Sequence, residues 1–411
     1  NLPKQQRDAT SPPRPSPVRP NMKYSQAIVA SAMLNAVLLC SFVSLLPSER
    51  MTLQSAAVRS GSMTGFMPRM MQRGSAARAS MAVGASPMKV LIVQNKGGGH
   101  GEIGYHLANR LADKGHKVTL LGDPATKKEA VPFSEYPALE AKGVTVAYGD
   151  ACDPSTFTAL GEFDAVFDNI AKSKDTCKTV ADLAKGWGVK NFGYVSSAGM
   201  YKPGAVFPMS ESLPVKDTAG QKEVEDYLAE IGLPWSSFRP QYIYGPLTNK
   251  RDYLDYFFDR VVRGQPVPVA GSGQQLVTLT HANDVAGMLE SVLDAPDKAA
   301  GQVFNCATDQ LISVDALIEA CAKIAGVATP PIVHYDPKAV TLEKKAFPFR
   351  DSHFFVAPDK AKTELGYQCE HDLETELKAY YEGYKAIGKD KKDMSFPIDE
   401  AIFSQVSPLP A

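Results

Sequence analysis

Residues 88–104 read MKVLIVQNKGGGHGEIG, and this stretch decides the fold. Its first seven residues form an apolar run rich in β-branched side chains, which predicts a short buried strand. Three regularly spaced glycines follow, Gly98, Gly101 and Gly104. Residues 105–116 then carry apolar side chains at helical spacing, so the glycines are expected in a turn between a strand and a helix.

Such a turn is typical of the Rossmann fold, because glycines allow a tight turn and let a pyrophosphate approach the backbone at the helix N-terminus. Four further apolar runs of strand length follow, with an amphipathic stretch before the last of them. These runs are residues 117–123, 144–150, 163–169 and 191–197. Strands that alternate with helices predict an α/β protein with a doubly wound parallel sheet.

The chain is expected to divide into a core, a lobe and a tail. We expect residues 87–240 to form the Rossmann nucleotide-binding core. Residues 241–395 mix strand and helix patterns and are expected to form a smaller C-terminal α/β lobe, interleaved with the core, that binds substrate or RNA. Residues 396–411 are predicted to be a partly loose tail.

Residues 1–86 are interpreted as a leader outside the fold. The chain begins with Asn, and one interpretation is that residues 1–21 are read-through before a start at Met22. The apolar stretch 27–46 resembles the core of a signal peptide, and residues 50–86 have the Arg- and Ser-rich, acid-free composition of a transit peptide. This arrangement resembles the bipartite leader of proteins sent to complex plastids. The alternative is a membrane anchor at 27–46, although we expect the mature protein not to span a membrane.

Charge and cysteine content narrow the classes of function. The leader is basic, so the remainder of the chain is acidic, which excludes nucleic-acid binding by bulk charge alone. Five of the six cysteines lie beyond the leader, widely spaced and without a C-x-x-C pair. They predict free thiols in a reducing compartment rather than disulfides or a zinc site.

Acidic residues follow strands at the positions where a dinucleotide is held. Asp123 ends the second predicted strand, near the place of the acidic residue that binds the ribose. Asp150 and Asp153 follow the third strand and resemble the Asp that extended short-chain dehydrogenases place near the adenine, which implies that role here. Together with the three glycines these residues predict an NAD(P) site. The alternative is that the glycines serve only the turn and that Asp150 caps a helix.

Several motifs resemble the extended short-chain dehydrogenases and nucleotide-sugar epimerases, and they occur in family order. They are GGGHGEIG (97–104), YVSSAGMY (194–201), SFRPQYIYGP (237–246), VPVAGSGQQLVTLTHANDVA (267–286) and GQVFNCATDQLISVDALIEA (301–320). In that superfamily a Tyr, a Lys four residues later and a Ser carry the redox step. Ser197 matches the Ser.

The Tyr and Lys are expected near residues 217–230, but neither reading of this stretch contains the Tyr. If Glu225 sets the register, Gln221 occupies the Lys position and Asp217 the Tyr position. If Lys222 is the Lys, the Tyr position is Thr218. A positioned acid–base group contributes roughly 10²–10⁴-fold to a rate, so classical redox activity is not expected.

A narrower resemblance extends into the C-terminal region. The stretches YFFDRVVRGQPVP (256–268), IVHYDPKAV (332–340), KAFPFRDSHFF (345–355) and GKDKKD (388–393) are similar to the chloroplast stem-loop-binding proteins. The resemblance implies a plastid RNA-binding protein that acts on stem-loop RNA and affects transcript stability. It also implies divalent-metal-assisted endoribonuclease activity, ribosome association and homo- or hetero-oligomers.

An acidic protein can bind RNA through a local patch of cations and aromatic residues. Three patches are candidates: the first lies near Tyr253, the second near Phe347, and the third is a group of lysines at Lys385, Lys389, Lys391 and Lys392. Their cations are Lys250, Arg251, Arg260 and Arg263 in the first, and Lys344, Lys345 and Arg350 in the second. The alternative is that the aromatic residues belong to the core and that the cations are simply solvated.

Metal-assisted cleavage would require carboxylates that converge on one Mg²⁺ ion. Asp150, Asp153, Asp164 and Asp168 lie near predicted strand ends and could converge, but no ligand spacing singles them out. Two alternatives to RNA binding stay open. One is an NAD(P)-dependent nucleotide-sugar epimerase, dehydratase or reductase, and the other is a non-catalytic nucleotide-binding scaffold.

Overall fold

The computed structural model describes residues 86–97, 99–344 and 346–406. The predicted leader, Gly98 and Lys345 therefore lie outside the described residues. The centre is a seven-stranded sheet in the order β11-β6-β5-β4-β1-β2-β3, with every pair parallel. Its strands are β1 (Lys89–Val93), β2 (Lys117–Gly122), β3 (Thr145–Tyr148), β4 (Ala165–Asp168), β5 (Asn191–Val195), β6 (Trp235–Pro240) and β11 (Gln302–Cys306). This order is that of a Rossmann fold with one added strand, which confirms the predicted fold class.

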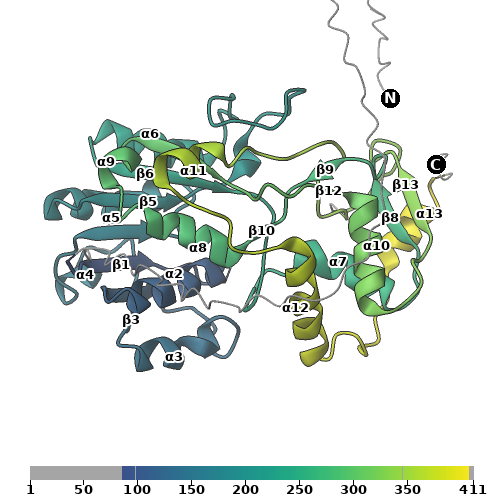
Figure 1. Ribbon diagram of the computed structural model, residues 1–411, viewed down its shortest axis with the longest axis horizontal. Helices are drawn as coiled ribbons and strands as arrows, with labels where there is room; N and C mark the ends of the chain where they lie inside the picture. The colour runs from purple at the N-terminus through teal and green to yellow at the C-terminus, as the bar shows by residue number, and fades with distance from the viewer. Residues whose placement is uncertain (1–85, 98, 345, 407–411) are drawn as a thin grey trace, which may run out of the picture. The chain divides into compact units, whose positions relative to one another are not determined.

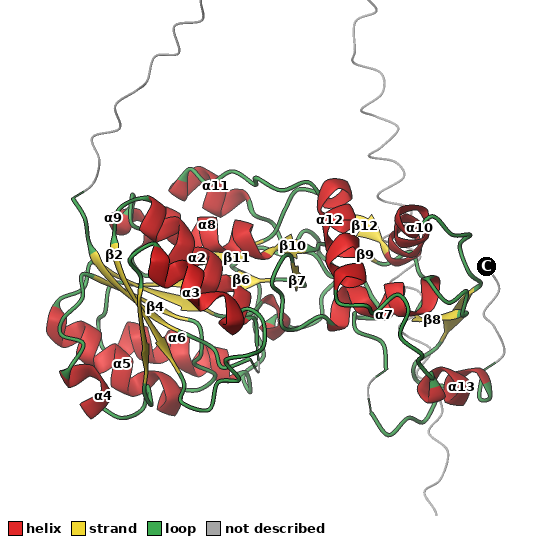
Figure 2. Cartoon of the chain, turned by 90° about the horizontal axis from the view of Figure 1, so that it is seen from below, coloured by secondary structure: helices red, strands yellow, loops and turns green. Residues whose placement is uncertain are grey.

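Helices cover both faces of the sheet (Figure 2). One face carries α2 (Gly101–Asp113), α3 (Tyr136–Ala141), α8 (Ala282–Ser291), α9 (Pro296–Ala299) and α11 (Asp359–Leu365); the other carries α4 (Ser155–Thr158), α5 (Lys174–Trp187) and α6 (Gly220–Glu230). Side chains along β1 alternate between the two cores: Val90 and Ile92 pack with α2 and α8, while Leu91 and Val93 pack with α5 and α6. Burial on both sides explains the continuous apolar run at 88–94.

A smaller α/β region lies beside the main sheet, at the right in Figure 1. It contains α7 (Asp252–Val261), α10 (Val314–Ala325), α12 (Leu373–Ala386) and α13 (Pro397–Phe403), with the parallel pair β8 (Val267–Ala270) and β13 (Ile332–Tyr335). Two short strand pairs connect the regions, β7 (Ile243–Tyr244) with β10 (Thr280–His281) and β9 (Leu276–Val277) with β12 (Ile312–Ser313). The smaller region has a hydrophobic core of its own, which includes Phe257, Phe258 and Tyr384.

The boundaries at residues 240 and 395 stay predictions. The chain returns to the main sheet after residue 241, because α8, β11 and α11 all pack there. Part of the predicted tail is helix α13, in which Ile402 is buried.

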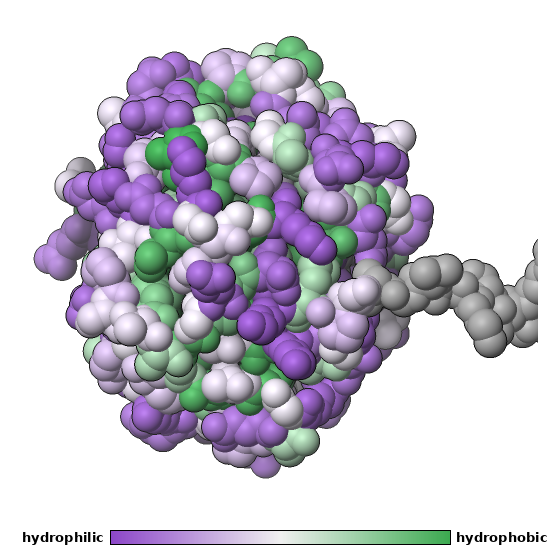
Figure 3. Space-filling model, turned by 90° about the vertical axis from the view of Figure 1, so that its left-hand side faces the viewer, coloured by the Kyte–Doolittle hydropathy of each residue, from purple (hydrophilic) through white to green (hydrophobic). Residues whose placement is uncertain are grey.

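The surface of the described residues is mixed. The face that looks left in Figure 1 is mainly hydrophilic, with hydrophobic side chains scattered over it (Figure 3). No helix among residues 86–97, 99–344 and 346–406 has the length and apolarity to cross a bilayer. All five cysteines of this part are free; Cys177, Cys306 and Cys321 are buried, whereas Cys152 is exposed.

Candidate functional site

A cleft lies at the carboxyl ends of the parallel strands, where ligands bind in open α/β sheets. It consists of two cavities. One, of about 300 Å³, adjoins the ends of β1, β2 and β3 and is lined by Asp123 and Asp150. The other, of about 210 Å³, adjoins the ends of β4, β5 and β6 and is lined by Ser196, Ser197 and Gln221.

The glycine turn ends where α2 begins, at Gly101. Gly104 packs closely against the buried Gln94, because a Cβ there would lie 2.6 Å from the end of the Gln94 side chain, which would have to move. Gln94 in turn donates through Nε2 to the carbonyl oxygen of Gly101 at 2.8 Å. The predicted turn between β1 and α2 is therefore confirmed for the described glycines.

Side-chain amides accept hydrogen bonds from three backbone donors of this turn. The Oδ1 atom of Asn95 accepts hydrogen bonds from Gly97 N at 2.7 Å and Gly99 N at 3.0 Å. The Oδ1 atom of Asn249 accepts from Gly101 N at 2.8 Å, and its Nδ2 donates to the carbonyl oxygens of Gly97 and Gly99. A pyrophosphate in a Rossmann cleft needs donors of this kind, and three of them, the N–H groups of Gly97, Gly99 and Gly101, are already bonded to side chains in this structure.

The two predicted carboxylates lie together in the larger cavity. Asp123 forms an ion pair with Lys96 at 2.8 Å and accepts from Ala125 N at 2.7 Å. Asp150 accepts from Cys152 N at 2.8 Å. Carboxylates at adjacent strand ends can accept hydrogen bonds from ribose hydroxyls, so this half of the cleft suits a nucleoside.

The superfamily's Tyr-Lys pair is absent from the smaller cavity. Gln221 lines it at the position expected for the Lys. Lys222 instead forms an exposed ion pair with Asp226 at 2.6 Å, and Asp217 pairs with Lys202 at 2.9 Å. The hydroxyl of Ser197 accepts a hydrogen bond from Gly199 N at 3.0 Å, which makes it the cap of a short helical turn. No acid–base pair of the superfamily type forms among these described residues.

Tyrosines reach the smaller cavity from the other side, but they do not replace the missing phenol. Tyr242 and Tyr253 both line it. The Tyr242 hydroxyl accepts from Arg350 N at 3.0 Å. Burial raises the pKa of Tyr242 and also that of Tyr253, so both phenols stay protonated near neutral pH.

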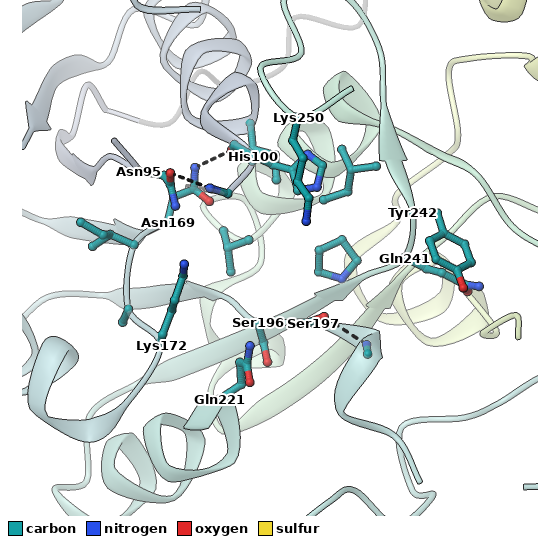
Figure 4. A pocket seen from close by; sticks show the side chains of 18 of the residues that line it. Asn95, His100, Asn169, Lys172, Ser196, Ser197, Gln221, Gln241, Tyr242 and Lys250 are labelled. Carbon is teal, nitrogen blue, oxygen red and sulfur yellow. Dashed lines mark hydrogen bonds between the residues drawn. The ribbon is translucent and has the colours of Figure 1, made fainter. Parts of the chain in front are cut away.

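Two lysines point into the space of the smaller cavity (Figure 4). Lys250, a predicted RNA contact, comes from the segment before α7. Lys172 comes from the loop after β4 and also lines the larger cavity. The sequence pattern does not mark Lys172, and its place four residues past a strand end is the one signal available. The amides of Asn95 and Asn249 carry no sequence signal for their role.

Three predicted RNA-binding arginines face the interior, which corrects the expectation of one exposed cationic patch. Arg260 is buried and makes two 2.7 Å hydrogen bonds to Asp399 of α13. Arg251 pairs with Asp255 at 2.9 Å and lies over the Tyr380 ring. Arg263 donates to the carbonyl oxygen of Lys389 at 2.8 Å. They lie on or beside α7, which packs within the smaller region, so these side chains hold its helices together.

The second predicted patch remains accessible in part. Lys344 is exposed and lines a cavity of about 410 Å³ with Phe347, Phe349 and Arg350. Arg350 lies over the Phe354 ring at 3.6 Å and donates to the carbonyl oxygen of Gly199 at 3.1 Å. This contact places Arg350 at the edge of the smaller cavity.

The four predicted metal carboxylates do not form a group. Asp164 precedes β4 and binds Lys89 N, whereas Asp168 ends the same strand and caps Ile170 and Ala171. Two other groups of described residues bring potential ligand atoms within 4.8 Å of one another, namely His281, His371 and Glu376, and Asp284, Glu370 and His371. Their imidazole content suits Zn²⁺ better than Mg²⁺, which prefers oxygen ligands.

Comparisons with known proteins agree with the Rossmann fold described above. The NAD dependent epimerase/dehydratase family matches residues 97–307, and the chain belongs to this family. Within this family, the chain is 34% identical over 340 residues to the Chloroplast stem-loop binding protein of 41 kDa b from Arabidopsis thaliana. The aligned residues cover 80% of this chain and 88% of the relative. The predicted resemblance is therefore confirmed.

Solved structures show the fold alone. A UDP-glucose 4-epimerase from Thermotoga maritima superposes with a TM-score of 0.59 at 21% identity, covering 73% of this chain and 99% of the epimerase. A dTDP-glucose 4,6-dehydratase from Streptomyces venezuelae with NAD bound also gives 0.59, at 18% identity, covering 73% of this chain and 97% of the dehydratase.

Proposed function

We propose that this protein is a plastid RNA-binding protein that recognises stem-loop RNA. The observation that carries the proposal is its 34% identity, over most of both chains, to a chloroplast stem-loop binding protein. The cleft supports the proposal because it lacks the groups that the family's redox chemistry needs. Gln221 and Asp217 stand where the redox Lys and Tyr are expected, so the family's usual chemistry lacks its acid–base pair.

The proposed RNA surface is the mouth of the smaller cavity, where cations from four segments converge. We define the cleft-mouth surface as Lys172, Lys216, Lys250, Arg350 and Tyr253. Lys216 and Arg350 both donate to the carbonyl oxygen of Gly199, at 3.0 and 3.1 Å, and Lys172 and Lys250 point into the cavity. Such cations can bind phosphates, and the half-buried Tyr253 ring can stack on an unpaired base.

Metal-assisted endonucleolytic cleavage, ribosome association and oligomer formation are finer parts of the same proposal. They rest on the resemblance to the stem-loop-binding proteins. Delivery to a complex plastid by a bipartite leader rests on residues 1–86, which lie outside the described residues.

The test is a titration of the protein with a labelled stem-loop RNA at about 150 mM salt, where charges beyond roughly 8 Å are screened. It is run with and without Mg²⁺, against an unstructured RNA of equal length. Because the leader is basic, the full chain is compared with a chain that starts at residue 87. Preference for the stem-loop by both forms supports the proposal, and cleavage only with Mg²⁺ supports the nuclease part. Binding that disappears with the leader would reject it.

The second candidate is an NAD(P)-dependent epimerase, dehydratase or reductase, or a scaffold that holds the nucleotide without turnover. The cavity beside Asp123 and Asp150 favours nucleotide binding. The discriminating assay is turnover of UDP-glucose in the presence of NAD or NADP. We expect none, because no acid–base pair lines the smaller cavity in the part of the chain that the structure describes.

A further inference from the structure

Segment 246–250 lies between β7 and α7 and is bonded along its length to the glycine turn and α2. The carbonyl oxygen of Pro246 lies 3.2 Å from His106 Nε2. Thr248 donates through Oγ1 to Glu102 Oε1 at 2.9 Å, and both side chains are buried. Asn249 adds three hydrogen bonds to Gly97, Gly99 and Gly101. The segment is therefore fixed against the N-terminus of α2 at three successive points.

Asn249 occupies the place where this fold binds an anion. The first N–H groups of a helix are unpaired within the helix, and together with the helix dipole they attract a phosphate. Here Gly101, the first residue of α2, donates to Asn249 Oδ1 at 2.8 Å. Asn95 Oδ1 takes the N–H groups of Gly97 and Gly99. A pyrophosphate that binds the Gly101 N–H would have to displace Asn249 and break its three bonds.

The cleft is divided at the same place. Asn95, Ile170 and Lys172 line both cavities, so they form the partition between them. The larger cavity, about 300 Å³, is at the lower limit for small-ligand pockets. It offers the carboxylates of Asp123 and Asp150 to hydroxyls, and the Lys172 ammonium lies beside it for one phosphate.

We propose that Asn249 is a built-in occupant of the pyrophosphate position, and that the larger cavity binds a single nucleotide unit instead of a dinucleotide. The ligand is one nucleoside with one phosphate, either a free nucleoside monophosphate or one nucleotide of an RNA strand. The inference does not depend on RNA binding. Displacement of Asn249 would free the Gly101 N–H for a pyrophosphate.

The experiment measures binding of AMP, NAD and NADP to the full chain by titration calorimetry. We expect AMP to bind about tenfold more tightly than NAD or NADP, since opening a set of hydrogen bonds costs on the order of 1.4 kcal/mol. Asn249→Ala should raise NAD affinity by about tenfold and leave AMP affinity within about twofold. Asn109→Ala, an amide replaced later on α2, should change neither.

Asn249→Asp is the second variant and predicts the opposite sign. It keeps an acceptor for Gly101 N and adds a negative charge at the helix N-terminus, so NAD should bind more weakly than to the wild type. Thermal melting shows whether each variant is folded, and Asn249→Asp carries the test if Asn249→Ala is not.

Three results would overturn the inference: NAD binding as tight as AMP, an NAD-to-AMP ratio that Asn249→Ala and Asn249→Asp leave unchanged, or no binding of AMP. Competition between AMP and a bound stem-loop RNA then identifies the source of the nucleotide. Competition indicates a nucleotide of the RNA strand, and its absence indicates the free monophosphate. RNA affinity is measured in a separate titration. Loss of RNA binding would reject the proposed function, and it is thereby distinguished from a failure of the inference about Asn249.

Discussion

Arg239 and Glu225 form a bidentate ion pair behind the cleft, with nitrogen–oxygen distances of 2.5 and 3.1 Å and side chains only 6% and 7% exposed. Arg239 lies on β6 and Glu225 on α6. The hydroxyls of Ser196 and Ser237 donate to the same carboxylate, at 3.1 and 2.6 Å. The pair therefore anchors α6 to the end of β6. In the superfamily, this helix region would hold the Tyr and Lys that are missing here.

Removing one partner should destabilise the protein strongly. Glu225→Gln leaves the buried Arg239 charge uncompensated, which costs about 3–5 kcal/mol in the free energy of unfolding. Asp226→Asn on the same helix breaks only the exposed pair with Lys222 and should cost at most about 1 kcal/mol. Urea denaturation measures both, and equal losses would contradict the structural role of the buried pair.

A methyl group at Gly220 should also destabilise the protein. A Cβ at this first residue of α6 would overlap the carbonyl oxygen of Lys172, and backbone cannot yield as a side chain can. We expect Gly220→Ala to lower the free energy of unfolding by about 1–3 kcal/mol.

The control for Gly220 is another helical glycine. Gly186 in α5 has open space where a Cβ would lie, with no other atom within 4 Å, so Gly186→Ala should stabilise the protein by about 0.5–1 kcal/mol. A gain for both variants in thermal or urea melts would show that α6 does not need its close approach to the loop after β4.

Charge removal at the cleft-mouth surface should weaken RNA binding. If Lys172 and Lys250 each contact a phosphate, Lys172→Ala and Lys250→Ala should each lower the slope of log Kd against log salt by about 1. Lys298→Ala removes an exposed charge on α9 and is the control. Slopes equal to that of the control, measured from about 50 to 200 mM salt, would place the RNA elsewhere.

The stability of the protein should depend on the protonation of His371. Its 2.7 Å hydrogen bond to Asp284 raises the pKa of His371 above the ordinary value, so the folded state holds this proton more tightly than the unfolded state. The contribution is complete below about pH 6.5 and is lost as pH rises through the raised pKa. Its stacked neighbour His281 stays neutral there, because burial lowers the pKa of His281 to about 3.

His371→Gln should remove this dependence. The wild type should lose stability relative to His371→Gln as pH rises above about 6.5 in parallel urea titrations. A difference that is constant with pH would show that the proton is not linked to folding.

The sequence predicted the Rossmann core well, because the patterns that mark its strands, turns and helices lie within short stretches of the chain. The strand at 88–94, the glycine turn and the following helix need only neighbouring residues to be recognised. β11 could not be assigned to the sheet, since its partner β6 lies more than sixty residues earlier in the chain. Asn249 acts on Gly101 across 148 positions, and an asparagine has no pattern that reveals such a contact.

The site was predicted less completely for a physical reason. Asp123 follows β2 and Asp150 follows β3, and these two strands pair in parallel. Their position in the same cavity therefore follows from the fold. Arg260 looked like a phosphate contact, but its guanidinium faces Asp399, a residue of the expected tail. Whether a cation faces solvent or a carboxylate depends on segments distant in sequence.

The chain passes repeatedly between the main sheet and the smaller region. It enters the smaller region at α7 and β8, returns to the sheet at α8 and β11, leaves again for α10 and β13, returns at α11 and then adds α12 to the smaller region. No single scission of the backbone can therefore part the two regions. The exposed turn at 327–329 is a natural place for a protease to cut. The C-terminal piece beyond the cut would still contribute β13 to β8, α11 to the main core and α12 to the smaller core. A nicked molecule should thus travel as one particle, and its two fragments should be able to complement each other when mixed.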